Sequence, residues 1–173
     1  MNSRSSDNSK FKIKHSKLEG GDAGEAYNRA IKYLAYRARS EAEVRTRLAR
    51  AGFLPAAIAP ALEKLRAEKL LDDEAFARGF ARARIEDRGF GPLRLERELR
   101  QKGLAQALIG RILDESFDKR QGRDRARALL EKRFRGKDLG DRKTLYRAVS
   151  FLRRRGYRDS VIAEIIRLPL GDD

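Results

Sequence analysis

The chain has 173 residues, of which 41 are Lys or Arg and 26 are Asp or Glu, giving a formal net charge of +15 at pH 7. It contains no Cys and one histidine, His15, which excludes disulfides, cysteine nucleophiles, histidine-based triads and multi-histidine metal sites. No window approaches the roughly 18 apolar residues of a membrane span, and the first 21 residues lack the apolar core of a secretory signal. These limits favour a soluble, intracellular protein whose partner is an acidic polymer or an acidic protein surface.

Residues 1–24 are polar and interrupted by glycines, so we expect a flexible tail there. From about Glu25 onward the apolar spacing becomes helical, and a first helix is expected over about 25–38. Ser40, with Glu43 three residues later, predicts a capping box at the start of a second helix. Gly52 fits the left-handed residue that ends this helix, and a third helix is expected over about 55–69.

Six positions of this first segment recur twice in the chain. They are Val44, Leu48, Gly52, Phe53, Ile58 and Leu62; then, 51 residues later, Leu95, Leu99, Gly103, Leu104, Ile109 and Leu113; then, after a further 53 residues, Ala148, Leu152, Gly156, Tyr157, Ile162 and Ile166. The match indicates a threefold repeat with copies at 25–71, 72–119 and 120–173. One copy of three short helices buries little alone, so stacked copies are expected. We therefore predict an all-α fold of three tandem three-helix repeats forming an elongated, curved solenoid-like body.

The second copy carries its own helix signals. Asp72 predicts an N-cap, and Phe76 lies on the apolar face of the helix that follows. Pro92, directly after Gly91, fits the first position of the next helix, which Gly103 ends.

Basic residues are concentrated on the first two helices of each copy, and residues 26–72, 73–121 and 122–173 carry net charges of +5, +2 and +7. A solvated face with intrahelical pairs such as Glu96–Arg100 explains any single one of them. As a set they leave charge uncompensated, and arginine suits carboxylate and phosphate recognition. The candidate contact residues are Arg37, Arg39, Arg45, Arg47, Arg50, Arg78, Arg82, Arg84, Arg88, Arg94, Arg97, Arg100, Lys102, Arg153, Arg154 and Arg155.

Two DNA-binding alternatives remain open at this stage: a non-specific nucleic-acid binder and a helix-turn-helix transcription regulator. The third helix of each copy stands where a helix-turn-helix protein has its recognition helix, but offers few side chains able to read bases. No arrangement of residues supplies a nucleophile, a metal site or a phosphate loop. We therefore expect no enzyme activity, no cofactor and no metal.

Three ordered groups of residues resemble the signatures of the RecX family, bacterial regulators of the RecA recombinase. The groups are Ala35 to Ser40 with Leu48 and Gly52; Leu71-Asp72-Asp73 with Phe76, Glu98-Leu99 and Lys102-Gly103; and Phe151-Leu152 with Arg155-Gly156-Tyr157. The resemblance covers about residues 27–168. Its signature positions are capping and core residues, namely Ser40, Glu43, Gly52, Asp72, Phe76, Leu99, Gly103, Leu152 and Gly156.

The resemblance implies a cytoplasmic bacterial protein that binds RecA, chiefly its filament on single-stranded DNA. It implies restraint of ATP hydrolysis, strand exchange and coprotease activity, and so a role in recombination, DNA repair and the SOS response. We expect a monomer that binds single- or double-stranded DNA weakly. We expect no association with a membrane. Assigning the contacts to the basic residues is an inference from charge, because the family has no catalytic residues to transfer.

Overall fold

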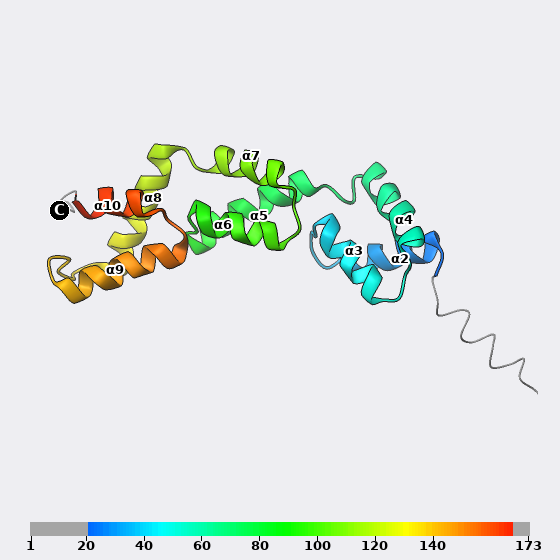
Figure 1. Ribbon diagram of the computed structural model, residues 1–173, viewed down its shortest axis with the longest axis horizontal. Coiled ribbons are helices and arrows are strands. Elements are labelled where there is room, and N and C mark those ends of the chain that lie inside the picture. The colour runs from blue at the N-terminus through cyan, green and yellow to red at the C-terminus, as the bar shows by residue number, and fades with distance from the viewer. Residues whose placement is uncertain (1–20, 168–173) are drawn as a thin grey trace, which may run out of the picture. The chain divides into compact units, whose positions relative to one another are not determined.

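The computed structural model describes residues 21–167, which form nine α-helices and no β-strand (Figure 1). The chain divides into two compact units, one ending at Asp73 and the other beginning at Glu74. Each unit is considered by itself. His15 and nearly all of the predicted tail lie outside the described residues. Within residues 21–167, no helix combines the length and the apolarity that a bilayer crossing requires.

The first unit contains three helices around one core. They are α2 (Ala23–Leu34), α3 (Glu41–Arg50) and α4 (Pro55–Ala67). Helix α2 packs along α4 and against α3, and the small buried residues Ala26 and Ala30 permit this close approach. Val44, Leu48 and Leu62 are completely buried in the same core.

The first helix differs from the range predicted from the sequence. It begins at Ala23 because Asp22 caps it, its carboxylate accepting from the Glu25 N–H at 2.7 Å. It ends at Leu34, four residues before the predicted end at 38. The chain has to be extended at Ser40 (φ −72°, ψ 158°) for that residue to cap α3, so the helix stops and a short connection follows.

The predicted capping box at Ser40 is confirmed. The Glu43 N–H donates to Ser40 Oγ at 3.2 Å, and the Ser40 N–H donates back to Glu43 Oε2 at the same distance. Ser40 is fully buried, which makes this cap part of the core as well as the start of α3.

The three glycines that revealed the repeat have one conformation. Gly52, Gly103 and Gly156 have φ values of 91°, 75° and 88°. The residue after each glycine donates its N–H to the backbone carbonyl of a buried leucine five positions earlier. The N···O distances are 3.2 Å in the first copy, 3.4 Å in the second and 3.1 Å in the third. Each glycine N–H bonds to the carbonyl three positions before it, which completes a Schellman turn. This shared turn confirms the threefold repeat.

The second unit holds two such three-helix groups. The first consists of α5 (Asp73–Arg88), α6 (Pro92–Gln101) and α7 (Gln106–Ser116), and the second of α8 (Lys119–Phe134), α9 (Arg142–Arg155) and α10 (Asp159–Arg167). Each group has its own core, around Leu95 and Leu99 in one and Leu130 and Leu152 in the other. With the first unit, they make the predicted all-α architecture of three three-helix repeats.

Backbone hydrogen bonds join the two repeats of the second unit, together with a bond from Arg94 Nη1 to the Arg154 carbonyl at 3.1 Å. The Gly91 N–H donates to the Arg155 carbonyl at 2.7 Å, and the Leu93 N–H donates to the Gly156 carbonyl at 3.0 Å. The start of α6 therefore lies against the end of α9 (Figure 1). A Cβ atom on Gly91 would come within 2.6 Å of the Gly156 carbonyl oxygen, so this contact requires glycine.

Candidate interaction surface

The candidate residues Arg37, Arg39 and Arg47 gather in the first unit around Tyr33 and Glu43. Arg37 Nη2 lies 3.0 Å and Arg39 Nη1 3.9 Å from Glu43 Oε1, the carboxylate of the capping box. Arg39 and Arg47 also lie over the Tyr33 ring, at 4.2 and 5.7 Å from its centroid. Arg39 is largely covered, and these contacts hold the connection between α2 and α3.

Two further candidates of the first unit lie on α3. Arg45 pairs with Glu41 one turn earlier at 2.7 Å. Arg50 is exposed at the end of the helix. Within the described residues it has no carboxylate at ion-pair distance, which leaves its charge available to a partner.

Four candidates of the second repeat form ion pairs, two between helices and two within α6. Arg78 on α5 binds Glu115 on α7 through Nε at 3.0 Å and Nη2 at 3.2 Å, and this carboxylate raises the pKa of the arginine. Arg84 and Arg94 share Glu98, at 2.9 and 3.5 Å. Arg100 pairs with the neighbouring Glu96 at 2.6 Å. Arg78 and Arg84 thus join α5 to α7 and α6, whereas Arg94 and Arg100 pair within α6.

The remaining candidates of the second repeat divide into two kinds. Lys102 lies near the Phe80 ring, its Nζ 5.9 Å from the centroid. Arg82, Arg88 and Arg97 are exposed, and no carboxylate of the described residues pairs with them.

The arginine run at the end of α9 is split by the helix geometry. Arg153 is exposed and pairs with Asp159 at 2.7 Å, which raises its pKa. Arg154 is exposed and has no ion pair within the described residues. Arg155 faces the other way, with its guanidinium 5.2 Å from the Phe151 ring centroid and its carbonyl bound to Gly91. The three do not form one contact surface.

Four exposed residues of α9 were not among the predicted contacts, namely Arg142, Lys143, Tyr146 and Arg147. Tyr146 is 72% exposed. A signal was available, because the sequence of α9 contains six basic residues and no Asp or Glu. Its Asp141 cap, which accepts from the Thr144 N–H at 2.9 Å, precedes it.

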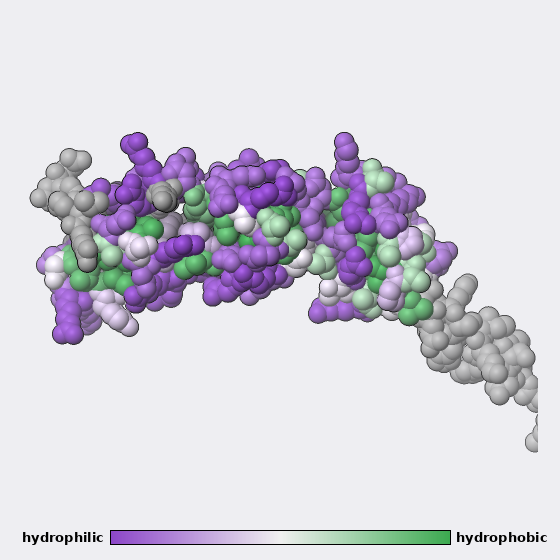
Figure 2. Space-filling model, turned by 45° about the horizontal axis from the view of Figure 1, so that its top comes forward, coloured by the Kyte–Doolittle hydropathy of each residue, from purple (hydrophilic) through white to green (hydrophobic). Residues whose placement is uncertain are grey.

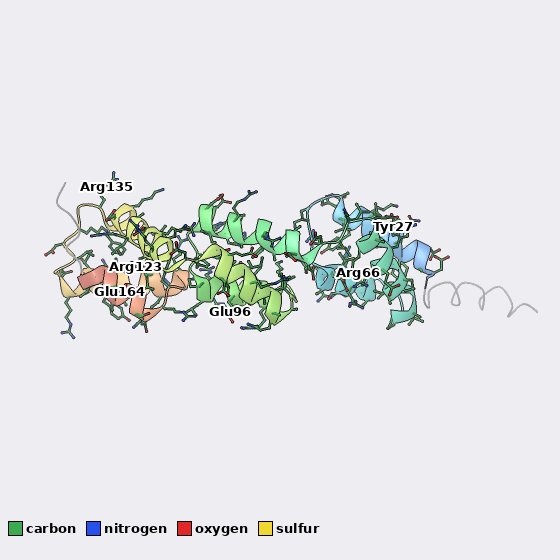
Figure 3. All side chains as sticks on the ribbon, turned by 90° about the horizontal axis from the view of Figure 1, so that it is seen from above. Tyr27, Arg66, Glu96, Arg123, Arg135 and Glu164 are labelled. Carbon is green, nitrogen blue, oxygen red and sulfur yellow. The ribbon has the colours of Figure 1, made fainter. Side chains whose placement is uncertain are left out.

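Ion pairs also occupy basic residues elsewhere in the third repeat. Figure 3 shows Arg123 of α8 beside Glu164 of α10, and the two side chains form an ion pair of 3.2 Å. Hydrophilic side chains nevertheless cover much of the face seen in Figure 2. Charge density alone therefore does not locate a binding surface.

The third helices of the repeats expose mainly small or acidic side chains, beside a few that can contact DNA, such as Arg66, Gln106 and Arg111. The exposed residues of α4 include Pro55, Ala56 and Ala59. Helix α7 exposes Asp114 and Glu115, while α10 exposes acidic residues of its own. Small side chains cannot reach base edges, and carboxylates would be placed against DNA phosphates.

An open hollow lies where the two repeats of the second unit meet. It is lined by Leu93, Arg153, Tyr157, Arg158 and Asp159. Leu93 is exposed there, while Tyr157 is buried, which raises its pKa to about 12.

Two family models match the chain: RecX, first three-helix domain, over residues 26–65, and RecX, second three-helix domain, over residues 72–113. A protein of Halorhodospira halophila named regulatory protein RecX is 40% identical over 140 residues, covering 80% of this chain and 85% of that protein. The RecX of Trichlorobacter lovleyi is 33% identical, covering 82% of this chain and 93% of that protein. The crystal structure of RecX from Lactobacillus salivarius matches with a TM-score of 0.73 and 25% identity, covering 84% of this chain and 95% of the other.

Proposed function

Because the chain belongs to the RecX family of regulatory proteins, we propose that it regulates a RecA-type recombinase. It binds the filament that the recombinase forms on single-stranded DNA and restrains ATP hydrolysis, strand exchange and coprotease activity. The likeness to regulatory protein RecX over most of both chains carries this proposal. The proposal places the chain in the bacterial cytoplasm, as a monomer without cofactor or catalysis of its own.

The exposed cations without a carboxylate partner supply a physical mechanism for filament binding. Arg50 in the first repeat and Arg82, Arg88 and Arg97 in the second are of this kind within residues 21–167. A filament offers the same acidic surfaces and phosphates at regular intervals. Several weak contacts on one chain then add through effective concentration, and a chain that bridges neighbouring subunits resists their rearrangement during nucleotide turnover.

The test is to titrate the full chain into RecA, single-stranded DNA and ATP at physiological salt and to follow hydrolysis. We expect hydrolysis to slow as the chain is added. A variant with Arg50, Arg82, Arg88 and Arg97 changed to Ala should require several times more protein for the same inhibition. A matched variant with Arg45, Arg100, Arg111 and Arg123 changed to Ala loses the same charge but only ion-paired side chains, and should inhibit like the unmodified chain.

Unchanged hydrolysis at saturating protein would contradict the proposal. If both variants lost inhibition equally, the unpaired arginines would not form the contact surface. The weaker inhibition would then follow from the lower net charge.

A non-specific nucleic-acid binder is the second candidate, and the carboxylate-free helix α9 favours it. That function predicts inhibition that excess naked DNA abolishes and that falls steeply with salt. A regulator of the filament predicts inhibition that persists when excess DNA is present.

A further inference from the structure

We propose that the outward face of α9 is a binding surface for single-stranded nucleic acid. The proposal concerns a cationic tract, defined here as Arg142, Lys143, Tyr146, Arg147, Arg153 and Arg154. It does not require RecA, because it depends only on the charge and geometry of this helix.

Helix periodicity places the whole tract on one side of α9. At 3.6 residues per turn, these six side chains span an arc of about 140° around the helix axis and about 18 Å along it. All six are exposed. The opposite side carries Ala148 and Leu152, both completely buried in the core of the third repeat. The tract is therefore a continuous strip whose backbone is fixed by packing behind it.

The charge of this strip is only partly compensated. Within the described residues, Arg142, Lys143, Arg147 and Arg154 have no carboxylate at ion-pair distance. Only Arg153 has one, in Asp159 at 2.7 Å. Helices α5 and α6, by contrast, carry Glu and Asp among their arginines. Two carboxylates lie close to the strip: Asp159 beside Arg153, and Asp141, whose pKa is lowered chiefly by its hydrogen bonds to Thr144 and also by Arg147. Four of the five cations nevertheless lack an ion pair among the described residues, and this excess attracts a polyanion.

Tyr146 distinguishes a single strand from other polyanions. Its side chain is 72% exposed and lies between Lys143 and Arg153 along the strip. Sequence-independent single-strand sites combine a cationic track for the backbone with aromatic rings on which bases stack. A phosphate chain on Lys143, Arg147 and Arg154 would leave a base free to stack on Tyr146. An acidic peptide has no equivalent use for the ring.

The test measures binding of the full chain to a fluorescein-labelled oligothymidylate by anisotropy, without recombinase, between about 50 and 200 mM salt. A variant with Lys143, Arg147 and Arg154 changed to Gln should bind at least tenfold more weakly at low salt. Its plot of log affinity against log salt should lose about 2 in slope, because each single-strand phosphate contact contributes about 0.7.

The matched control changes Arg45, Arg100 and Arg111 to Gln, removing the same charge from ion-paired positions. It should bind within about threefold of the unmodified chain. Equal weakening of both variants would overturn the proposal, since affinity would then follow net charge alone. Absence of oligothymidylate binding, or equally effective competition by polyglutamate, would also overturn it.

The aromatic contribution has its own readout. Tyr146→Ala should weaken single-strand binding by at least about fivefold without changing the salt slope and should affect duplex binding less, whereas Tyr146→Phe should bind as the unmodified chain does. Equal effects of Tyr146→Ala on single strand and duplex would overturn the assignment to single strands. Because no recombinase is present, these outcomes are independent of those that test regulation.

Discussion

Arginine side chains have two different uses in this protein. Arg84 and Arg94 converge on Glu98 and join α5 to α6, while Arg39 covers Tyr33 beside the Ser40 cap. Others, such as Arg97, face solvent without a carboxylate in the described residues. Removing an arginine of the first kind changes packing, whereas removing one of the second kind changes only the charge offered to a partner.

Tyr157 gives a pH-dependent prediction. Burial raises the pKa of its hydroxyl from 10.0 to about 12, because the phenolate is poorly solvated in the folded chain. The stability that neutral Tyr157 contributes is fully present below pH 10 and is lost as the pH rises towards 12. Tyr157→Phe should therefore lessen the fall of the melting temperature over this pH range. If the variant and the unmodified chain lose stability in parallel, Tyr157 is not the responsible group.

At the residue scale, the sequence predicted helix caps and left-handed glycines better than the surroundings of individual arginines. Ser40, Gly52, Gly103 and Gly156 were predictable because caps and left-handed turns depend on local backbone conformation. The orientation of Arg155 was not predictable, because it depends on the contact with Gly91, which belongs to another repeat.

Helices were predictable in number and type, but less so at their ends. The end of α2 was missed because Ala35 to Arg39 have no helix-breaking residue, and the Ser40 cap alone stops the helix. The start was missed because Asp22 and Glu25 are a capping signal within a glycine-rich stretch. The cationic tract on α9 is not evident as a run of arginines, because helix periodicity alone brings its separated residues onto one face.

The junction of α6 and α9 gives the prediction at the scale of elements. Gly156→Ala should destabilise the chain by roughly 2 kcal/mol or more, because its φ is 88° and a Cβ would lie 2.3 Å from the Arg94 backbone nitrogen. Gly110→Ala is the matched control. Gly110 lies inside α7 with nothing within 4 Å of a Cβ, so this change should stabilise by about 0.5–1 kcal/mol.

Urea denaturation of both alanine variants measures this difference. Equal effects of the two substitutions would mean that the backbone contact between α6 and α9 does not contribute to stability.

The molecule as a whole has separate cores, one in the first unit and two in the second. Three-helix repeats follow from the sequence because equivalent apolar positions recur. The division between Asp73 and Glu74 lies two residues from the predicted end of the first copy, but the nearly uniform spacing of the repeats does not predict that the second and third copies form one compact unit.

Separate cores predict local responses to cavities. Leu48→Ala should cost about 2–5 kcal/mol in the first unit, where Leu48 is completely buried. Hydrogen exchange should accelerate in residues 23–71 and remain nearly unchanged around Leu130 and Leu152, which belong to another core. Leu152→Ala should give the converse pattern. Uniform acceleration along the chain in either variant would show that the cores unfold as one.

The end-to-end meeting of α9 and α6 places two helix dipoles in series. The amino end of α6, which Gly91 and Pro92 leave without a side-chain cap, would otherwise attract a phosphate. Its amide hydrogens instead satisfy the carbonyls of Arg155 and Gly156, so the partial charges of both helix ends are neutralised. An anion near this corner of the second unit therefore meets side chains rather than helix amides, namely the guanidinium groups of Arg153 and Arg158 and the carboxylate of Asp159.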